Sequence, residues 1–159
     1  MALSNPRMEA VAAAFSPQCD DVRVRPVAVQ RDALTDLGLL LLRLVLGGVV
    51  LCHGIAKIAH GLEPVRHALE AHGMPAWLAY GALGGEVLGP VLLIAGFFGR
   101  VGAALIAINM VVAIALVHLA QVFSLNAEGG WAIELQAMLL FPAIALVLTG
   151  PGRWSVNTR

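Results

Sequence analysis

Four long apolar segments constrain this chain more than any other feature of its sequence. They occupy residues 37–58, 76–98, 101–123 and 130–149, and each is close to the ~20 residues that an α-helix needs to cross a bilayer. Hydrophobic residues make up 59% of the chain and charged residues 13%, whereas a soluble domain usually carries about 25% charged residues. The sequence therefore predicts an all-α integral membrane protein, built as a bundle of four transmembrane helices.

The residues outside these segments predict the orientation and the domain boundaries. Residues 1–36 are polar and contain three prolines, which is typical of a partly disordered tail, and residues 37–159 form the membrane domain. Arginines gather in the tail, in the turn at Arg100 and at the C-terminus. Because basic residues accumulate on the cytoplasmic side of membrane proteins, we expect both termini in the cytoplasm. The formal net charge of zero gives no indication of nucleic acid binding.

The longest connection between the apolar segments, residues 59–75, predicts a short extra helix. Leu62, Val65, Ala68 and Leu69 recur at helical spacing with polar residues between them. That pattern is typical of an amphipathic helix that lies on a membrane surface. We therefore expect a helix over residues 62–72 on the outer surface, between the first and second spans.

The first apolar segment contains three side chains that are costly in lipid, Arg43, His53 and Lys57. A charged side chain at bilayer depth costs at least ~2.5 kcal/mol on insertion scales. At 100° per residue, His53 and Arg43 each lie about 40° from Lys57, on opposite sides of it. The three residues therefore share one face of the helix, which we expect to point into the bundle.

Depth along the helices divides the polar residues into two predicted layers. Counting ~1.5 Å per residue predicts a central layer in which Arg43 reaches Glu86. Asn109 belongs to the same layer. Such an ion pair can hold the bundle together as readily as it can serve a function.

The second predicted layer lies toward the outer ends of the helices. It comprises His53, Lys57, His118 and Glu134. We expect these residues to converge beneath the helix at 62–72 and to line a pocket that opens to the outer leaflet. No metal-ligand spacing is present. Separately, Gly81, Gly85 and Gly89 recur every four residues, which favours close packing of the second helix against another helix.

Three stretches in this order resemble the DoxX family of small bacterial four-helix membrane proteins. They are "GLLLLRLVLGGVVLCHGIAK", "GGEVLGPVLLIAGFFGR" and "GPGRWS". The resemblance covers residues 37 to about 156 and omits the tail. It implies a location in the bacterial inner membrane and a link to membrane redox chemistry, including quinone reduction, in complexes with other subunits.

Three functional hypotheses follow from the residues and the resemblance together. The first is a subunit of a membrane oxidoreductase that binds a quinone between its helices, with His53, Lys57, His118 and Glu134 as hydrogen-bonding and proton-transferring groups. Electrons would then come from a partner chain. The second is a non-catalytic subunit that anchors a larger complex. The third, and least favoured, is a haem b protein with His53 and His118 as axial ligands, since both lie at similar depth on parallel helices.

Overall fold

The computed structural model describes residues 33–127 and 129–156, and the regular structure of these residues is helical apart from one isolated bridge between Leu125 and Trp131. Of the predicted tail, residues 1–36, residues 1–32 lie outside the described residues, and residues 33–36 form the start of the first helix. The elements are α2 (Ala33–His60), α3 (Glu63–Ala71), η1 (Ala76–Leu78), α4 (Ala79–Leu83), η2 (Gly84–Leu88), α5 (Gly89–Ala95), α6 (Gly99–Ala113), η3 (Ile114–His118), η4 (Leu119–Gln121) and α7 (Glu134–Thr149).

Three continuous helical stretches are long and apolar enough to cross a membrane. They are Ala33–His60, Ala76–Ala95 and Gly99–Gln121, and they correspond to the first three expected spans. The fourth apolar helix, α7, has 16 residues and is therefore about 24 Å long, which is shorter than a hydrocarbon core of ~30 Å. The short helix α3 occupies the connection for which an amphipathic helix was predicted.

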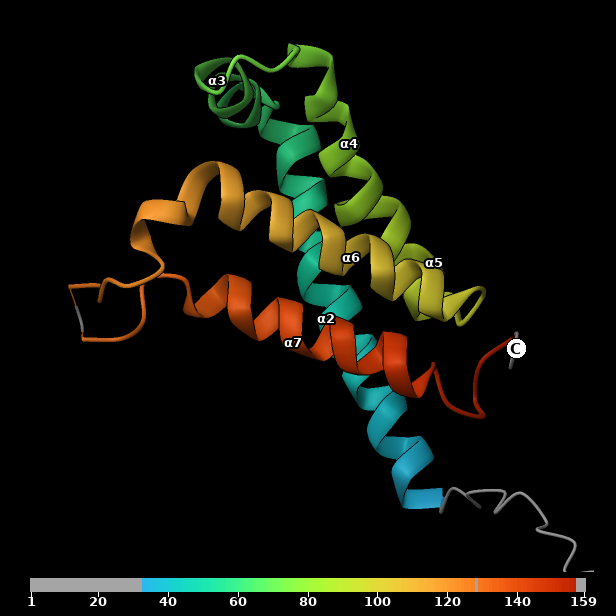
Figure 1. The fold of residues 1–159 in the computed structure, drawn as a ribbon. Coiled ribbons are helices and arrows are strands. Elements are labelled where there is room, and N and C mark those ends of the chain that lie inside the picture. Colours follow the sequence, from blue (N-terminus) through green and yellow to red (C-terminus); the bar gives the residue numbers. More distant parts are fainter. Residues whose placement is uncertain (1–32, 128, 157–159) are drawn as a thin grey trace, which may run out of the picture. The chain divides into compact units, whose positions relative to one another are not determined.

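The core lies where α2, α5, α6 and α7 meet, and glycines allow the closest of these contacts. Figure 1 shows α5 and α6 side by side and α7 along α6. A Cβ on Gly89 would lie 3.0 Å from the carbonyl oxygen of Gly102, and one on Gly85 would lie 2.7 Å from Asn109 Cγ. Nothing lies within 4 Å of such an atom on Gly81. The predicted glycine contact therefore involves Gly85 and Gly89 but not Gly81.

Two π-helical turns interrupt the otherwise regular helices. In η2, the N–H of Gly89 donates to the carbonyl of Gly84, five residues earlier. Pro90 follows directly and has no N–H that could donate to the carbonyl of Glu86 in the α-helical pattern. The second turn, η3, ends at His118. Single π-turns within α-helices occur often at functional sites, and both turns here carry polar residues.

Arg43 lies at the opposite end of α2 from Lys57 and binds the C-terminal segment, residues 150–156. Arg43 is 2% exposed, and its guanidinium donates to the carbonyls of Pro151 and Trp154, each at 3.0 Å. Asp36 lies about two turns before Arg43 on the same face of α2. Its carboxylate accepts a hydrogen bond from the backbone N–H of Arg153 at 3.1 Å. The predicted Arg43–Glu86 pair is therefore wrong, because Arg43 donates to backbone carbonyls and Glu86 pairs with Lys57.

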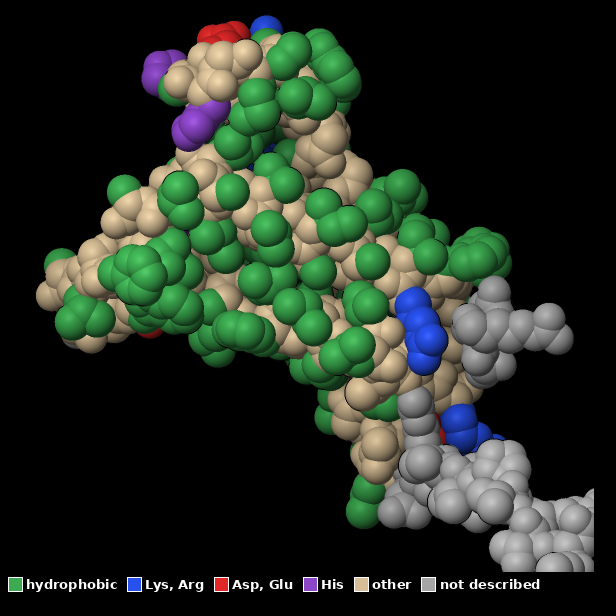
Figure 2. Space-filling view, viewed as in Figure 1, with side chains coloured by type: hydrophobic (Ala, Val, Ile, Leu, Met, Phe, Trp, Pro, Cys, Tyr) green, Lys and Arg blue, Asp and Glu red, His purple; other side chains and the backbone are tan. Residues whose placement is uncertain are grey.

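Apolar side chains cover most of the visible face in Figure 2. Charged and His side chains gather near α3 and near the C-terminal segment. Many of the outward residues are large and hydrophobic, among them Val45, Ile55, Ile108, Met138, Phe141 and Leu148. Such a surface is unfavourable in water and fits contact with lipid.

Candidate functional site

A cavity of about 290 Å³ lies between α2, α3, η2, α6, η3 and α7. Its walls are largely apolar, with Val50, Met110, Leu116 and Leu139 among the lining residues. Pro64, Val65 and Ala68 of α3 close one side. Apolar walls with a few convergent polar groups are the usual form of a small-molecule site.

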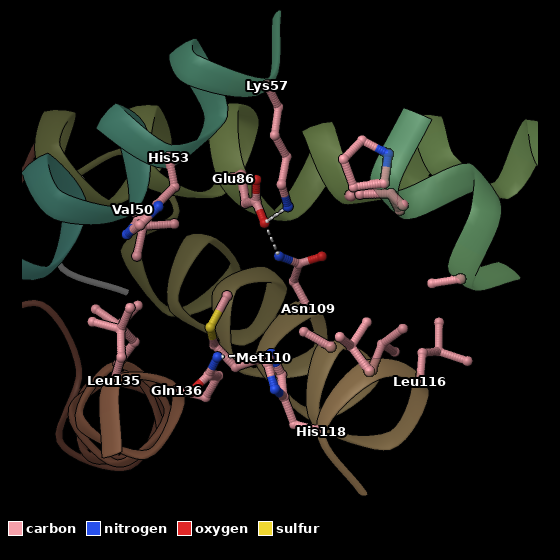
Figure 3. A pocket seen from close by; sticks show the side chains of 18 residues that line it. Val50, His53, Lys57, Glu86, Asn109, Met110, Leu116, His118, Leu135 and Gln136 are labelled. Carbon is pink, nitrogen blue, oxygen red and sulfur yellow. Dashed lines mark hydrogen bonds and ion pairs between the residues drawn. The ribbon is translucent and has the colours of Figure 1, made fainter. Parts of the chain in front are cut away.

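Glu86 is the centre of the main polar cluster in this cavity. Its side chain is 4% exposed and pairs through Oε1 with Lys57 Nζ, which retains 31% exposure. Asn109 Nδ2 donates to the same oxygen at 3.0 Å. In Figure 3, Lys57 and Asn109 approach Glu86 from different helices. Two helices, α2 and α6, therefore each contribute one partner to the buried carboxylate of η2, which has both an ammonium and an amide partner.

Two glycines make room for this cluster. A Cβ on Gly54 of α2 would collide with the carbonyl oxygen of Glu86 and would lie 2.8 Å from Val87 Cγ2. Gly85, which precedes Glu86, is in similarly close contact with Asn109. Only glycine permits such close approach, so Gly54 in α2 and Gly85 in η2 position the polar groups.

A second polar pair, His118 and Gln136, joins η3 to α7 on the opposite side of the cavity (Figure 3). His118 Nδ1 lies 2.9 Å from Gln121 Oε1, and its Nε2 lies 2.9 Å from Gln136 Nε2. An amide oxygen only accepts hydrogen bonds, so Nδ1 carries the proton and Nε2 accepts from Gln136. Both ring nitrogens are thus engaged in hydrogen bonds within the protein.

The structure brings together three of the four residues predicted for the outer pocket. His53, Lys57 and His118 line the cavity, whereas Glu134 is not among its lining residues. The Glu134 carboxylate is turned toward Gly130, where an added Cβ would lie 2.7 Å from Oε2. Glu134 is the first residue of α7, and from this position its side chain extends along the preceding loop and away from the cavity.

The carboxylate of the site comes instead from Glu86, which the sequence analysis assigned to a different layer together with Asn109. Lys57 lies 14 positions after Arg43 on α2, which corresponds to about 21 Å along the helix axis. Glu86 lies at the level of Lys57 and pairs with it. Gln136 was not among the residues predicted for the pocket, although it is a polar residue within an apolar segment.

Among the described residues, no group of three or more His, Cys, Asp and Glu side chains is arranged to hold a metal ion. The cavity instead offers hydrogen bonds. Lys57 is a donor, His118 and Gln136 are already joined to each other, and His53 presents an imidazole from α2. This chemistry fits an uncharged ring compound with polar substituents better than it fits a cation.

Comparisons with known proteins agree with a membrane location. The sequence model of the DoxX family matches residues 38–119. The chain is 33% identical over 127 residues to the "Uncharacterized membrane protein Rv3486" of Mycobacterium tuberculosis, covering 74% of this chain and 78% of that protein. It is 33% identical over 115 residues to the "Putative oxidoreductase CatD" of Bacillus subtilis, covering 72% and 81%. No solved structure matches the chain.

Proposed function

Because the chain belongs to the DoxX family of membrane proteins, we propose that it is a membrane-embedded subunit of a redox complex that binds a quinone or similar carrier in its cavity. The observation that carries the proposal is the cavity itself. It combines apolar walls with a cluster of Lys57, Glu86 and Asn109 that is held by three different helices.

The residues of the cavity fit the head group of a quinone. A quinone carbonyl accepts hydrogen bonds, and Lys57 retains N–H groups beyond the one that binds Glu86. Val50, Met110 and Leu116 supply the apolar surface that a substituted ring needs. When bound, a quinone would take up electrons and protons, and Lys57 and His53 are groups that can donate or accept a proton beside it.

The redox assignment is supported by the name of the Bacillus subtilis relative, "Putative oxidoreductase CatD". Electrons would come from a partner subunit that carries its own redox centre. The protein would therefore contribute the carrier site, and its partner would contribute the electron source.

We further propose that α7 completes a fourth span and that both termini lie in the cytoplasm of a bacterial inner membrane. Residues 130–133 precede α7 and extend the apolar stretch to 20 residues, which is about the length required. Arg100 and Arg153 lie at the same end of the helices as the C-terminal segment, in agreement with the positive-inside rule. With this orientation, α3 lies on the outer surface and covers the cavity from the outer leaflet.

Reporter fusions test the orientation. A fusion after Ala127 should report the outer side and one after the C-terminus the cytoplasmic side. If both report the same side, the four-span topology is wrong.

Binding measurements test the function. Purified protein in lipid nanodiscs should bind a decyl-substituted para-benzoquinone saturably, and Lys57→Met should weaken that binding by at least about tenfold through loss of a charged donor. Arg43→Lys, which alters the opposite end of α2, is the matched control and should leave binding unchanged. Protein that binds no quinone but purifies with stable partner subunits would favour the anchoring function instead.

A further inference from the structure

The hydrogen bond to Glu86 fixes the orientation of the Asn109 amide and therefore the position of its oxygen. Glu86 Oε1 accepts a hydrogen bond from Lys57 Nζ, so this oxygen acts as an acceptor. The Asn109 group 3.0 Å from Glu86 Oε1 must therefore be the NH₂. The amide oxygen, Oδ1, is consequently turned away from Glu86 and toward the cavity, as Figure 3 shows.

Within the described part of the chain, no group donates a hydrogen bond to Asn109 Oδ1. Asn109 is half-buried, and its Oδ1 is not fully enclosed by protein. It is therefore an acceptor that remains free on the cavity wall. Lys57 Nζ lies near this amide group, because the ammonium and the amide NH₂ both bind the same oxygen of Glu86. The wall thus presents a donor and an acceptor next to each other.

We infer that the cavity selects a ligand with a hydroxyl group at this position, that is, a hydroquinone or another phenol in preference to the quinone. This inference rests on the proposed function, since it concerns the same cavity. A hydroxyl group accepts from Lys57 and donates to Asn109 with a single oxygen. A quinone carbonyl accepts from Lys57 but leaves Asn109 Oδ1 without a donor. The bound ring also excludes the water that would otherwise donate to Oδ1.

Glu86 acts in this scheme as a positioning residue. It does not need to touch the ligand, because its Oε1 holds both Lys57 and Asn109, and its Oε2 is enclosed by protein and has no partner among the described residues. The carboxylate decides which end of the Asn109 amide faces the cavity. Asn109 is the residue that sets the specificity.

The selectivity follows from the cost of an unpaired acceptor. Leaving a buried acceptor without a donor is disfavoured by its full desolvation. We expect a preference of about tenfold for the hydroquinone, which corresponds to about 1.4 kcal/mol.

The test compares three ligands of one shape in nanodiscs under nitrogen by titration calorimetry. They are a decyl-substituted para-benzoquinone, its hydroquinone and the di-O-methyl ether of that hydroquinone, which accepts but does not donate. Wild-type protein should bind the hydroquinone about tenfold more tightly than the quinone, and the ether no better than the quinone.

Two variants assign the preference to Asn109. Asn109→Leu, close in shape but without the amide, should bind hydroquinone and quinone with affinities within about twofold of each other, because the unpaired acceptor is gone. Glu134→Gln, which changes a carboxylate outside the cavity lining, should retain the tenfold preference.

The outcomes separate this inference from the function on which it rests. If neither ring form binds wild-type protein, the proposed function fails and this inference fails with it. If both forms bind equally, the carrier site stands and the inference is wrong. A preference that persists in Asn109→Leu also contradicts it. Should that variant not fold, an ether that binds wild-type protein as tightly as the hydroquinone contradicts it.

Discussion

The two cationic side chains of α2, Arg43 and Lys57, bind different kinds of partner. At one end, Arg43 is 2% exposed and donates to two backbone carbonyls of the C-terminal segment. At the other end, Lys57 pairs with Glu86 beside a cavity of about 290 Å³. Arg43 thus ties α2 to the C-terminal segment and does not line the cavity, whereas Lys57 and Asn109 present a donor and an acceptor to the cavity.

Charged residues on one face of an apolar helix can therefore have different roles. Arg presents a fixed fork of donors that two carbonyls can occupy without a carboxylate. Lys is a single flexible point charge that requires an anion when it is buried, and Glu86 supplies it. A polar residue in a span therefore indicates function only when its partners leave some hydrogen-bonding capacity unused at a cavity.

The largest expected effect concerns the ion pair at the Lys57 end. Lys57→Met leaves the Glu86 carboxylate buried with Asn109 as its described partner, and removing one member of a buried pair costs about 3–5 kcal/mol. We expect about 3 kcal/mol, because Lys57 keeps 31% exposure and surface pairs contribute less. Thermal unfolding in a fixed detergent measures the loss.

The double variant is the control for this prediction. In Lys57→Met with Glu86→Gln, the buried charge is removed together with its partner, so the loss should be smaller than in Lys57→Met alone. If the loss of unfolding free energy in the double variant equals the sum of the losses in the two single variants, the two side chains do not interact in the folded protein.

A smaller effect is expected at the Arg43 end. Arg43→Met removes two charge-assisted hydrogen bonds, worth about 1.5–3 kcal/mol each, but the carbonyls at the end of the bundle can take up water. We expect a loss of about 2 kcal/mol, faster trypsin cleavage after Arg153, and unchanged quinone affinity in the protein that remains folded. An equal loss of quinone affinity from Arg43→Met and Lys57→Met would abolish the distinction between the two ends.

The smallest effect sharpens the assignment of the glycines. Gly85→Ala places a Cβ 2.7 Å from Asn109 Cγ, and such overpacking costs about 1–3 kcal/mol. We expect about 1.5 kcal/mol together with weaker quinone binding, because Asn109 is pushed from its position. Gly81→Ala meets nothing within 4 Å and should be neutral or stabilise the helix by up to about 1 kcal/mol. Equal effects of the two substitutions on unfolding and binding would contradict this account.

The sequence predicted much of the fold, because apolar length and periodicity are local properties. The helices at Ala33–His60, Ala76–Ala95 and Gly99–Gln121 correspond to three of the four apolar segments. The fourth segment forms a helix only from Glu134 onward, since the residues before it form a turn with the bridge between Leu125 and Trp131.

The candidate site was predicted only in part, because depth and rotation depend on how helices pack. Counting residues placed Glu86 with Arg43, but the helices are offset so that Glu86 lies beside Lys57. The C-terminal carbonyls that bind Arg43 carry no sequence signal, since every residue has a carbonyl. The face of α2 with His53 and Lys57 could be predicted, because both residues lie on one helix and share its geometry.

The most direct test of the central claim, that the Lys57 end holds the ligand and the Arg43 end is structural, is photoaffinity labelling with an azido-substituted quinone. The protein would be labelled in nanodiscs, and the modified peptides would be mapped by mass spectrometry. We expect saturable labelling of residues that line the cavity in the second half of α2, in η2 and in η3, reduced by excess unlabelled quinone. Competable labelling confined to residues 94–100 and 150–156, or no competable labelling at all, would contradict the account.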